Sequence, residues 1–342
     1  MKKSPFAVVI FCFSLLAMFS IGVLIISGFS VGKNEGSQPK QPIEVESKNP
    51  QPEASSLIEP LPEDKASSVD MVALKDELLP IVGEYNACEW YVYVEDFETG
   101  EKCYFSWSPL IGTGTDTMDK PLVSASVIKM FVAGAAYNSA GVLLPNPTLD
   151  KDIEAMISQS DNNATNAIVE WLGEGTVADG FKAVNSFAAE SGFAGVTINR
   201  KMGDFTQPLT ENTVSVHACA KVLREIFAKK YVNSECSDKL ISFLETQSIT
   251  NKIPSGIPRN SGIKVYNKTG ELPNKYVPDE NNNGVENDIA VVTAKDGSPV
   301  YIICVFSNTV NDNKLAAEGI AEISKATYNA FFGDDNKENI IA

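Results

Sequence analysis

The distribution of apolar and charged positions divides the chain into an apolar N-terminal run, a polar spacer and a long patterned stretch. Residues 4–32 contain no charged side chain, and Lys2 and Lys3 precede them. A run of this length can cross a bilayer, and lysines before it favour an N-terminus on the cytoplasmic side. We therefore expect residues 1–33 to form a membrane anchor. A signal segment cleaved near Gly28-Phe29-Ser30 is the alternative.

Residues 34–68 are rich in Pro, Glu, Ser, Gln and Lys. Such a composition does not bury enough apolar surface to fold, so we expect a disordered linker. It would hold the following domain outside the cell membrane, behind a single N-terminal pass, or the chain would be secreted after signal cleavage. At the other end, residues 334–342 are expected to be a frayed tail.

The patterned stretch, residues 69–333, predicts one folded domain. Apolar spacing indicates a helix from Val72 to Gly83, and two aromatic runs around Gly100 indicate a hairpin. The period is then helical over residues 126–257. Strands are predicted at 263–268, 288–294 and 299–307, with a helix at 314–332. This order predicts an α+β fold in which residues 69–125 and 258–333 form an antiparallel five-stranded sheet flanked by terminal helices, with residues 126–257 as an inserted all-helical subdomain.

Charge and composition exclude several classes of function. The net charge of −16 argues against nucleic acid as a partner. The single histidine, His217, lies in a helical run and is interpreted as structural, which disfavours a Ser-His-Asp triad and a histidine zinc site. The six cysteines include no Cys-x-x-Cys, although Cys219 and Cys236 could bridge two helices. We expect no metal or organic cofactor, and we interpret the half EF-hand pattern from Asp279 to Gly284 as a polar hairpin tip.

One apolar stretch, Ser124-Ala125-Ser126-Val127-Ile128-Lys129-Met130-Phe131, carries a serine and a lysine three positions apart. On a helix, positions i and i+3 lie on one face. A lysine whose pKa is lowered by burial or by another cation can act as a base toward a hydroxyl. Ser126 and Lys129 are therefore a candidate nucleophile and base. Because the spacing alone is common, a surface helix is the alternative unless further motifs support the pair.

A second motif, Ser160-Asp161-Asn162, lies between two predicted helices. Asp161 and Asn162 are suited to cap a helix N-terminus, which is the structural interpretation. A loop here would also hold the Ser160 hydroxyl, which can relay a proton, and the Asn162 amide, which can bind a substrate carbonyl.

A third motif, Lys268-Thr269-Gly270-Glu271, ends a predicted strand. A buried lysine there is costly unless it has a partner or a role. Its charge would lower the pKa of Lys129 and attract a substrate carboxylate, to which Thr269 adds a hydroxyl. Gly270 permits close backbone approach. The N–H of Glu271 would join that of Ser126 as an oxyanion hole.

Ser-x-x-Lys, Ser-Asp-Asn and Lys-Thr-Gly in this order are the motifs of penicillin-recognising serine enzymes. Over residues 69–333 the chain resembles the class A β-lactamase-like serine hydrolases, which have the β-lactamase/transpeptidase-like fold. The resemblance implies Ser126 as acylating nucleophile, Lys129 as base, Ser160 as proton relay, and Lys268 with Thr269 as carboxylate-binding groups.

One departure from the family pattern concerns the loop that follows the helices. Class A enzymes carry a deacylating glutamate in an Arg-x-Glu setting, whereas this chain has Arg200-Lys201-Met202. Asp204 and Glu211 are candidate replacements, but we interpret each as a partner that fixes Arg200 and the loop. Without this base, a β-lactam acyl-enzyme should persist.

The resemblance therefore predicts a monomeric serine hydrolase that is acylated by β-lactams and hydrolyses them slowly. The first alternative is a D-Ala-D-Ala carboxypeptidase, or penicillin-binding protein, acting on peptidoglycan stem peptides. The second is an anchored sensor or wall-binding module without turnover. The expected partners are the β-lactam or D-Ala-D-Ala peptide and, through the N-terminal helix, the membrane.

Overall fold

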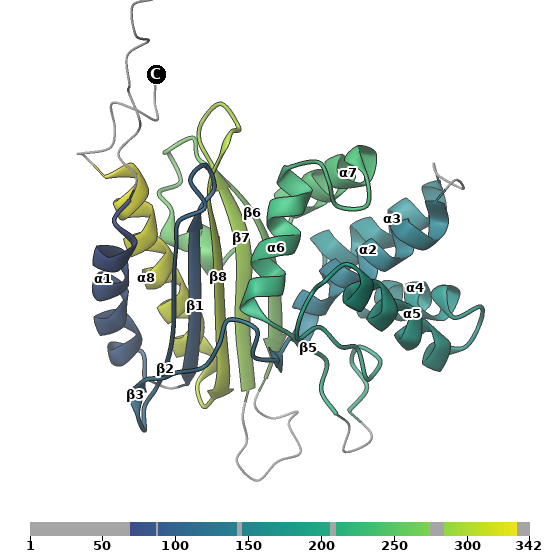
Figure 1. The fold of residues 1–342 in the computed structure, drawn as a ribbon, viewed down its shortest axis with the longest axis horizontal. Coiled ribbons are helices and arrows are strands. Elements are labelled where there is room, and N and C mark those ends of the chain that lie inside the picture. The colour runs from purple at the N-terminus through teal and green to yellow at the C-terminus, as the bar shows by residue number, and fades with distance from the viewer. Residues whose placement is uncertain (1–68, 87, 142–145, 206–209, 274–283, 334–342) are drawn as a thin grey trace, which may run out of the picture. The chain divides into compact units, whose positions relative to one another are not determined.

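The computed structural model of the protein describes residues 69–86, 88–141, 146–205, 210–273 and 284–333 (Figure 1). The predicted anchor, linker and tail lie outside these residues, as does nearly all of the predicted hairpin tip at 279–284. Within the described ranges, no helix combines the length and the apolar character that crossing a membrane requires.

The described elements follow the predicted order of helix, hairpin, helices, strands and helix. The helices are α1 (Met71–Glu84), α2 (Lys129–Ala140), α3 (Pro147–Ser158), α4 (Asn162–Leu172), α5 (Val177–Glu190), α6 (Val216–Phe227), α7 (Ser234–Glu245) and α8 (Asn313–Phe332), with 3₁₀ turns η1 (Ala125–Ile128) and η3 (Ile253–Gly256). The strands are β1 (Glu89–Asp96), β2 (Lys102–Ser108), β3 (Gly112–Thr113), β4 (Leu122–Val123), β5 (Thr213–Val214), β6 (Lys264–Leu272), β7 (Gly284–Thr293) and β8 (Pro299–Val310). The predicted α+β class is confirmed.

The main sheet has six antiparallel strands in the order β3-β2-β1-β8-β7-β6. The first and last parts of the described domain meet where β1 pairs with β8, with Val92 opposite Val305. The predicted count of five was wrong because Thr113 in β3 pairs with Trp107 in β2. A strand of two residues is too short to show the alternation on which a sequence prediction depends. β4 and β5 form a separate two-stranded ribbon.

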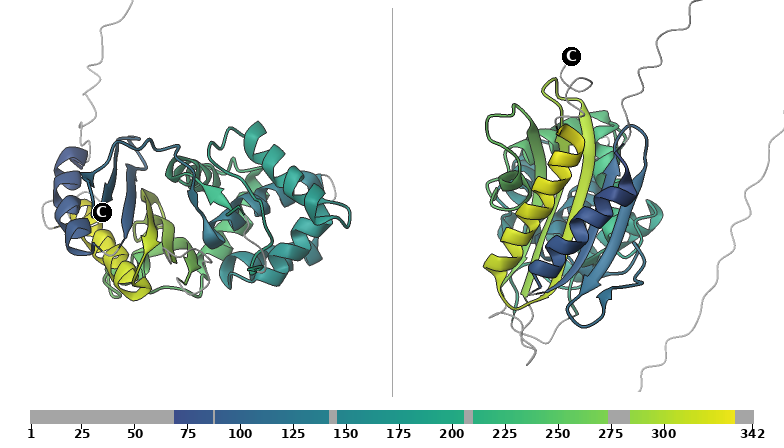
Figure 2. Two further views of the ribbon diagram at one scale, coloured as in Figure 1. Left: turned by 90° about the horizontal axis from the view of Figure 1, so that it is seen from below. Right: turned by 90° about the vertical axis from the view of Figure 1, so that its left-hand side faces the viewer.

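Each face of the sheet has its own hydrophobic core. Successive side chains of a strand point to opposite faces, so Trp90, Val92 and Val94 of β1 pack with α1 and α8, whereas Tyr91 and Tyr93 pack toward the helices α2–α7. Figure 2 shows α1 and α8 lying across one face of the sheet. Burial on both faces explains why the central strands are apolar along nearly their whole length.

Helix α2 is the centre of the helical part, and ten of its twelve residues are buried. A helix that is apolar on all sides belongs in the interior, and Lys129, its first residue, is the one charged side chain that it carries. The fold therefore takes this ammonium group fully out of solvent, with 0% of the residue exposed.

The bridge that Cys219 and Cys236 could form is absent, because both are buried free thiols. They lie on α6 and α7, and spacing along the chain could not show whether their sulfur atoms face each other. The structural interpretation of His217 agrees with its contact, since Nδ1 lies 2.9 Å from Asp119 Oδ1.

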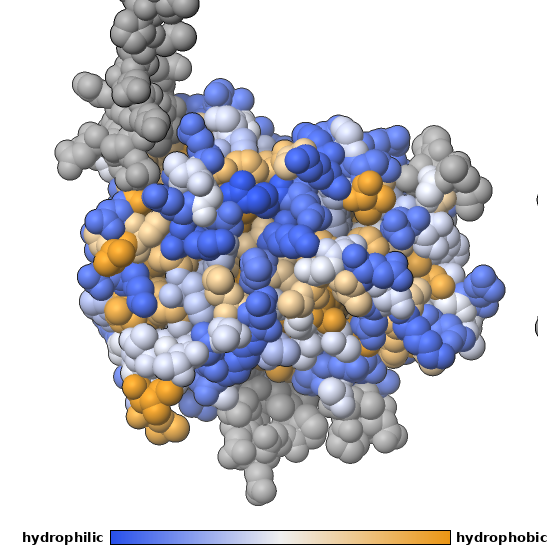
Figure 3. Space-filling model, in the orientation of Figure 1, coloured by the Kyte–Doolittle hydropathy of each residue, from blue (hydrophilic) through white to orange (hydrophobic). Residues whose placement is uncertain are grey.

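The surface in the view of Figure 3 is mostly hydrophilic, in keeping with the high negative charge. A hydrophobic patch lies near β3, where the chain exposes Leu110 and Ile111 immediately before the strand.

Candidate active site

Ser126 lies in the 3₁₀ turn η1, directly before α2, rather than in the first turn of an α-helix. Side chains at i and i+3 of a 3₁₀ turn eclipse each other, so Ser126 and Lys129 are presented on the same side. The Lys129 N–H donates to Ser126 O, and Ala125 has a left-handed φ of 43°. A non-glycine residue in this region indicates a turn that the surrounding packing enforces. Ser126 is 9% exposed.

The Lys129 Nζ has three oxygen atoms within hydrogen-bond distance. It lies 2.6 Å from Ser160 O, 3.2 Å from Ser160 Oγ and 2.8 Å from Asn162 Oδ1. Ser126 Oγ is not among these acceptors, and catalytic hydrogen bonds often form only once substrate is bound. Burial, followed by the charge of Lys268, lowers the pKa of Lys129 to about 6. At neutral pH most of this amine is therefore unprotonated and able to accept a proton.

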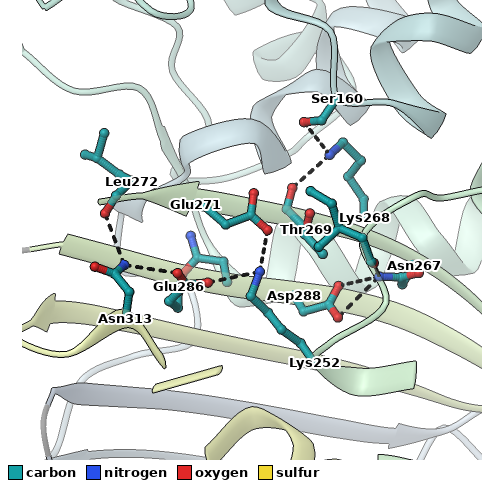
Figure 4. A network of polar contacts seen from close by, with 12 residues as sticks. Ser160, Lys252, Asn267, Lys268, Thr269, Glu271, Leu272, Glu286, Asp288 and Asn313 are labelled. Carbon is teal, nitrogen blue, oxygen red and sulfur yellow. Dashed lines mark hydrogen bonds and ion pairs between the residues drawn. The ribbon is translucent and has the colours of Figure 1, made fainter. Parts of the chain in front are cut away.

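The second motif brings its serine between the two lysines. Ser160 has a left-handed φ of 57°, and Asp161 caps α4 by accepting from Ala164 N at 2.7 Å. The capping interpretation of Asp161 is confirmed. The strained residue before the cap sends its hydroxyl into the site, where Oγ is 3.0 Å from Lys268 Nζ (Figure 4).

Lys268 is fully buried at the middle of β6. Besides the Ser160 hydroxyl, its Nζ donates to Thr269 O at 2.8 Å. Burial lowers the pKa of Lys268 to about 8, while the acids Glu271 and Asp288 act in the opposite direction. A buried lysine needs a hydrogen-bond partner, and for Lys268 the Ser160 hydroxyl is such a partner. With a pKa of about 8, Lys268 keeps its positive charge at neutral pH.

Strand β6 lies directly beside the Ser126 turn. A Cβ at Gly270 would lie 2.6 Å from Ser124 O and 3.1 Å from Ser126 N, so only glycine permits this approach. On the next strand, Asn287 Nδ2 donates to Val123 O at 2.9 Å and fixes the chain before the turn. The backbone of β6 at Gly270 is thus held close to the amide of Ser126.

Thr269 is fully buried, and within the described residues its Oγ1 has no hydrogen-bond partner. Buried hydroxyls are normally paired, so an unpaired one beside a cation is suited to a ligand atom. The Asn162 Oδ1 accepts from Lys129, and its Nδ2 lies close to Gly203, where a Cβ would be 3.3 Å away.

The loop that follows the helices is fixed at both ends. The Arg200 guanidinium pairs with Glu211, with Nη2 2.7 Å from Oε2, and Nη1 donates to Asp204 O. The interpretation of Glu211 as the loop-fixing partner is confirmed. Met202 is held by its backbone, since its N–H donates to Asn166 Oδ1 at 2.9 Å and its carbonyl accepts from Asn166 Nδ2 at 3.0 Å. Met202 is 9% exposed, and its sulfur lies 3.5 Å from Asn212 Nδ2.

The sequence interpretation missed the groups beneath the third motif. Lys252, before η3, pairs with Glu271 and Glu286, and Asp288 accepts from Asn267 Nδ2 and Ile253 N (Figure 4). Burial raises the pKa of Asp288 to about 7. The signal available in the sequence was the presence of two acids, Glu286 and Asp288, in the mostly apolar strand β7, because buried acids need a partner.

Comparison with known proteins gives one consistent family. Residues 145–331 match the model of the "Beta-lactamase enzyme family". A β-lactamase of Bacteroides uniformis is 26% identical over 231 residues, which are 63% of this chain and 73% of that protein.

Solved structures share the fold. A β-lactamase from Sphaerobacter thermophilus matches with a TM-score of 0.60 and 19% identity, over 77% of this chain and 98% of that one. A PBP-A mutant, solved as an acyl-enzyme complex with penicillin G, matches with a TM-score of 0.60 and 19% identity, over 76% and 97% of the two chains. At these identities, the likeness shows the fold and leaves the chemistry to the residues described above.

Proposed function

The chain belongs to the beta-lactamase enzyme family of serine hydrolases, and on this basis we propose that Ser126 is the nucleophile that β-lactams acylate. The observation that carries the proposal is the position of Ser160 Oγ between two buried lysines, 3.2 Å from Lys129 and 3.0 Å from Lys268. The pKa of Lys129 is about 6 and that of Lys268 is about 8. The lower pKa suits Lys129 to act as the base, and the higher pKa suits Lys268 to bind an anion.

In the acylation step, the neutral amine of Lys129 takes the proton of the Ser126 hydroxyl as Oγ bonds to the β-lactam carbonyl carbon. The ring C–N bond then breaks, and the Ser160 hydroxyl passes a proton to the leaving nitrogen. The amides of Ser126 and Glu271 would stabilise the oxyanion. Lys268 and the unpaired Thr269 hydroxyl would hold the substrate carboxylate, and Asn162 would bind the acylamide carbonyl.

Release of the acyl group is the step for which the site is poorly equipped. Met202 occupies the loop position where the family carries its water-activating glutamate, and a thioether cannot act as a base. The backbone of Met202 is fixed to Asn166 on α4 by two hydrogen bonds, so Met202 itself stays at this position. We therefore propose slow hydrolysis of β-lactams.

The same observation favours a second candidate, a D-Ala-D-Ala carboxypeptidase of the penicillin-binding kind. Such an enzyme forms its acyl-enzyme from a peptide and is blocked by a β-lactam whose acyl group stays bound. The resemblance to PBP-A is compatible with this activity. A site that is acylated once by the β-lactam and then remains blocked would also suit a sensor.

Burst kinetics with a chromogenic cephalosporin test the proposal. We expect a rapid burst of about one equivalent, followed by a much slower steady state. Fast steady turnover that is lost in Asp204→Ala would show that Asp204 supplies the missing base and would overturn the proposal of slow release. The absence of any burst would overturn the acyl-enzyme mechanism itself.

The pH dependence of acylation should follow the two lysines. Acylation by a carboxylate-bearing β-lactam is expected to rise as Lys129 loses its proton near pH 6 and to fall as Lys268 loses its charge near pH 8. Because the two lysines interact, the two apparent pKa values of the profile belong to the pair and not to either lysine alone. Second-order acylation rates measured from pH 5 to about 10 check this expectation, and Lys268→Arg should remove the alkaline limb because arginine keeps its charge. A flat profile would contradict it.

The location of the enzyme is a separate proposal that rests on the sequence. The uncharged run at residues 4–32 after Lys2 and Lys3 supports an N-terminal anchor with the catalytic domain outside the cell membrane. Protease added to intact cells should then remove the domain, and protection from the protease would contradict this location.

A further inference from the structure

Asn287 joins the main sheet to the turn that carries Ser126. It is fully buried in β7, between β6 and β8 (Figure 1). Its Nδ2 donates to Val123 O at 2.9 Å and to Ser124 O at 3.3 Å, while its Oδ1 accepts from Ser307 N at 3.2 Å. One end of the amide is thus held by the sheet, and the other end holds the chain two and three positions before Ser126.

The sheet leaves room for this contact. Asn287 is the cross-strand partner of Gly270 in β6, and directly paired residues point to the same face of a sheet. Because Gly270 has no side chain, Ser124 O approaches so closely that a Cβ would lie 2.6 Å from it. The pairing of β7 with β8 also shifts register just before Asn287, between Gly284 and Glu286. Register shifts of this kind are found beside active sites, where they redirect a side chain.

The backbone that Asn287 holds is strained. Ala125 has a left-handed φ of 43°, and a non-glycine residue keeps such a backbone only where its surroundings impose it. Because φ is the rotation about the N–Cα bond of Ala125, it depends on the planar peptide that contains Ser124 O. Asn287 fixes that peptide through Ser124 O and the preceding one through Val123 O. The peptide after Ala125 carries the Ser126 N–H, one of the two donors proposed for the oxyanion.

The other contacts of Ser124 do not replace those of Asn287. The Ser124 N–H and hydroxyl donate to Asn212 O at 2.9 and 3.0 Å. The Ser124 carbonyl also accepts from Val127 N at 3.1 Å, but this bond lies within the turn itself. Asn287 therefore supplies the link between the sheet and the carbonyl side of Ser124.

We propose that Asn287 is a positioning residue for acylation, which keeps Ala125 left-handed and so directs the amide and hydroxyl of Ser126 toward the substrate. This inference rests on the proposed function of Ser126. Asn287 is buried and acts through the turn rather than on the substrate. Without its hydrogen bonds, Ala125 relaxes to an ordinary backbone in a share of the molecules, and fewer molecules hold the turn that acylates.

The test measures acylation by benzylpenicillin in Asn287→Leu, which keeps the size of the side chain and removes its hydrogen bonds. Intact-mass time courses on the purified protein give the limiting rate, the half-saturating concentration and the fraction of molecules that react. We expect the limiting rate to fall about tenfold or more, in keeping with the strain of one left-handed residue. The half-saturating concentration should stay near the wild-type value, because the groups that bind the substrate are unchanged.

Ala125→Gly supplies a readout that a general loss of stability would not move. Glycine adopts a left-handed backbone without steric strain, so it should restore most of the limiting rate to the Asn287→Leu protein. Ala125→Gly alone is the reference. A larger gain from glycine in the Asn287→Leu background than in the wild type measures the coupling of the two positions.

Asn185→Leu is the matched control. Asn185, on α5, also fixes the backbone of a distant residue, since it accepts from Ile198 N at 2.8 Å and donates to Ile198 O at 3.1 Å. Its loss should lower the thermal stability and leave the limiting rate near that of the wild type. If Asn287→Leu does not fold, Asn287→Ser takes its place with the same expectations, because serine keeps a polar group but is shorter than the amide.

A wild-type limiting rate in Asn287→Leu, with or without a smaller reacting fraction, would overturn the inference and leave Asn287 as a structural residue. An equal fall in Asn185→Leu, or a slow rate that Ala125→Gly does not restore, would also overturn it. Failure of the proposed function is distinguishable, because the wild-type protein itself would then form no adduct.

Discussion

Replacing Lys129 with methionine is expected to slow acylation of Ser126 by about 10²–10⁴-fold, the usual contribution of a positioned base. Methionine has a similar length and no titrating group, so the change removes the amine and leaves the buried stem in place. The measurement is the rate of adduct formation with benzylpenicillin. The wild-type amine is suited to the role because burial and Lys268 lower its pKa to about 6.

The control for this prediction is Lys129→Arg, which keeps a positive charge beside Ser160 but cannot give up its proton. Both variants should acylate slowly. Thermal unfolding separates chemistry from folding, because methionine leaves Ser160 O and Asn162 Oδ1 without their donor, at a cost of about 1–3 kcal/mol for each unpaired group. If either variant acylates within about tenfold of the wild-type rate, the base is another group.

Replacing Met202 with glutamate is expected to accelerate release of the acyl group by about 10²-fold or more, because it places a general base in the loop at the family position. The backbone at this position is fixed by Asn166 on both its N–H and its carbonyl, so the new carboxylate starts from a defined place. Deacylation is measured as loss of the mass adduct after excess β-lactam is removed.

Met202→Gln serves as the matched control, because it has the same shape and no basic oxygen of comparable strength. Equal release rates in the glutamate and glutamine variants would show that the missing carboxylate is not what limits turnover. Slow release in wild type and fast release only in the glutamate variant would show that the missing carboxylate limits release of the acyl group.

The sequence predicted the parts of the site that are encoded by short motifs. Lys129, Ser160 and Lys268 meet as the three motifs indicated, because a helix, a capped loop and a strand each fix one side chain. It also predicted that Gly270 allows close approach, since the hypothetical Cβ would meet Ser124 O at 2.6 Å.

The rest depends on contacts between residues far apart in the chain. The 3₁₀ turn at Ser126 and the left-handed backbone of Ser160 result from packing, and neither residue type signals it. Lys252 and Glu286 are 34 positions apart, yet they pair because η3 lies against β7. The prediction missed one strand of the sheet for a simpler reason, because β3 is only two residues long.

Intact-mass spectrometry of the purified protein after exposure to benzylpenicillin tests the central claim, that Ser126 is the acylated nucleophile. The account predicts a stable mass gain of one penicillin on the wild type, located to the peptide that contains Ser126, and no gain on Ser126→Ala. A wild-type protein that gains no mass, or a Ser126→Ala protein that gains the same mass, would contradict it.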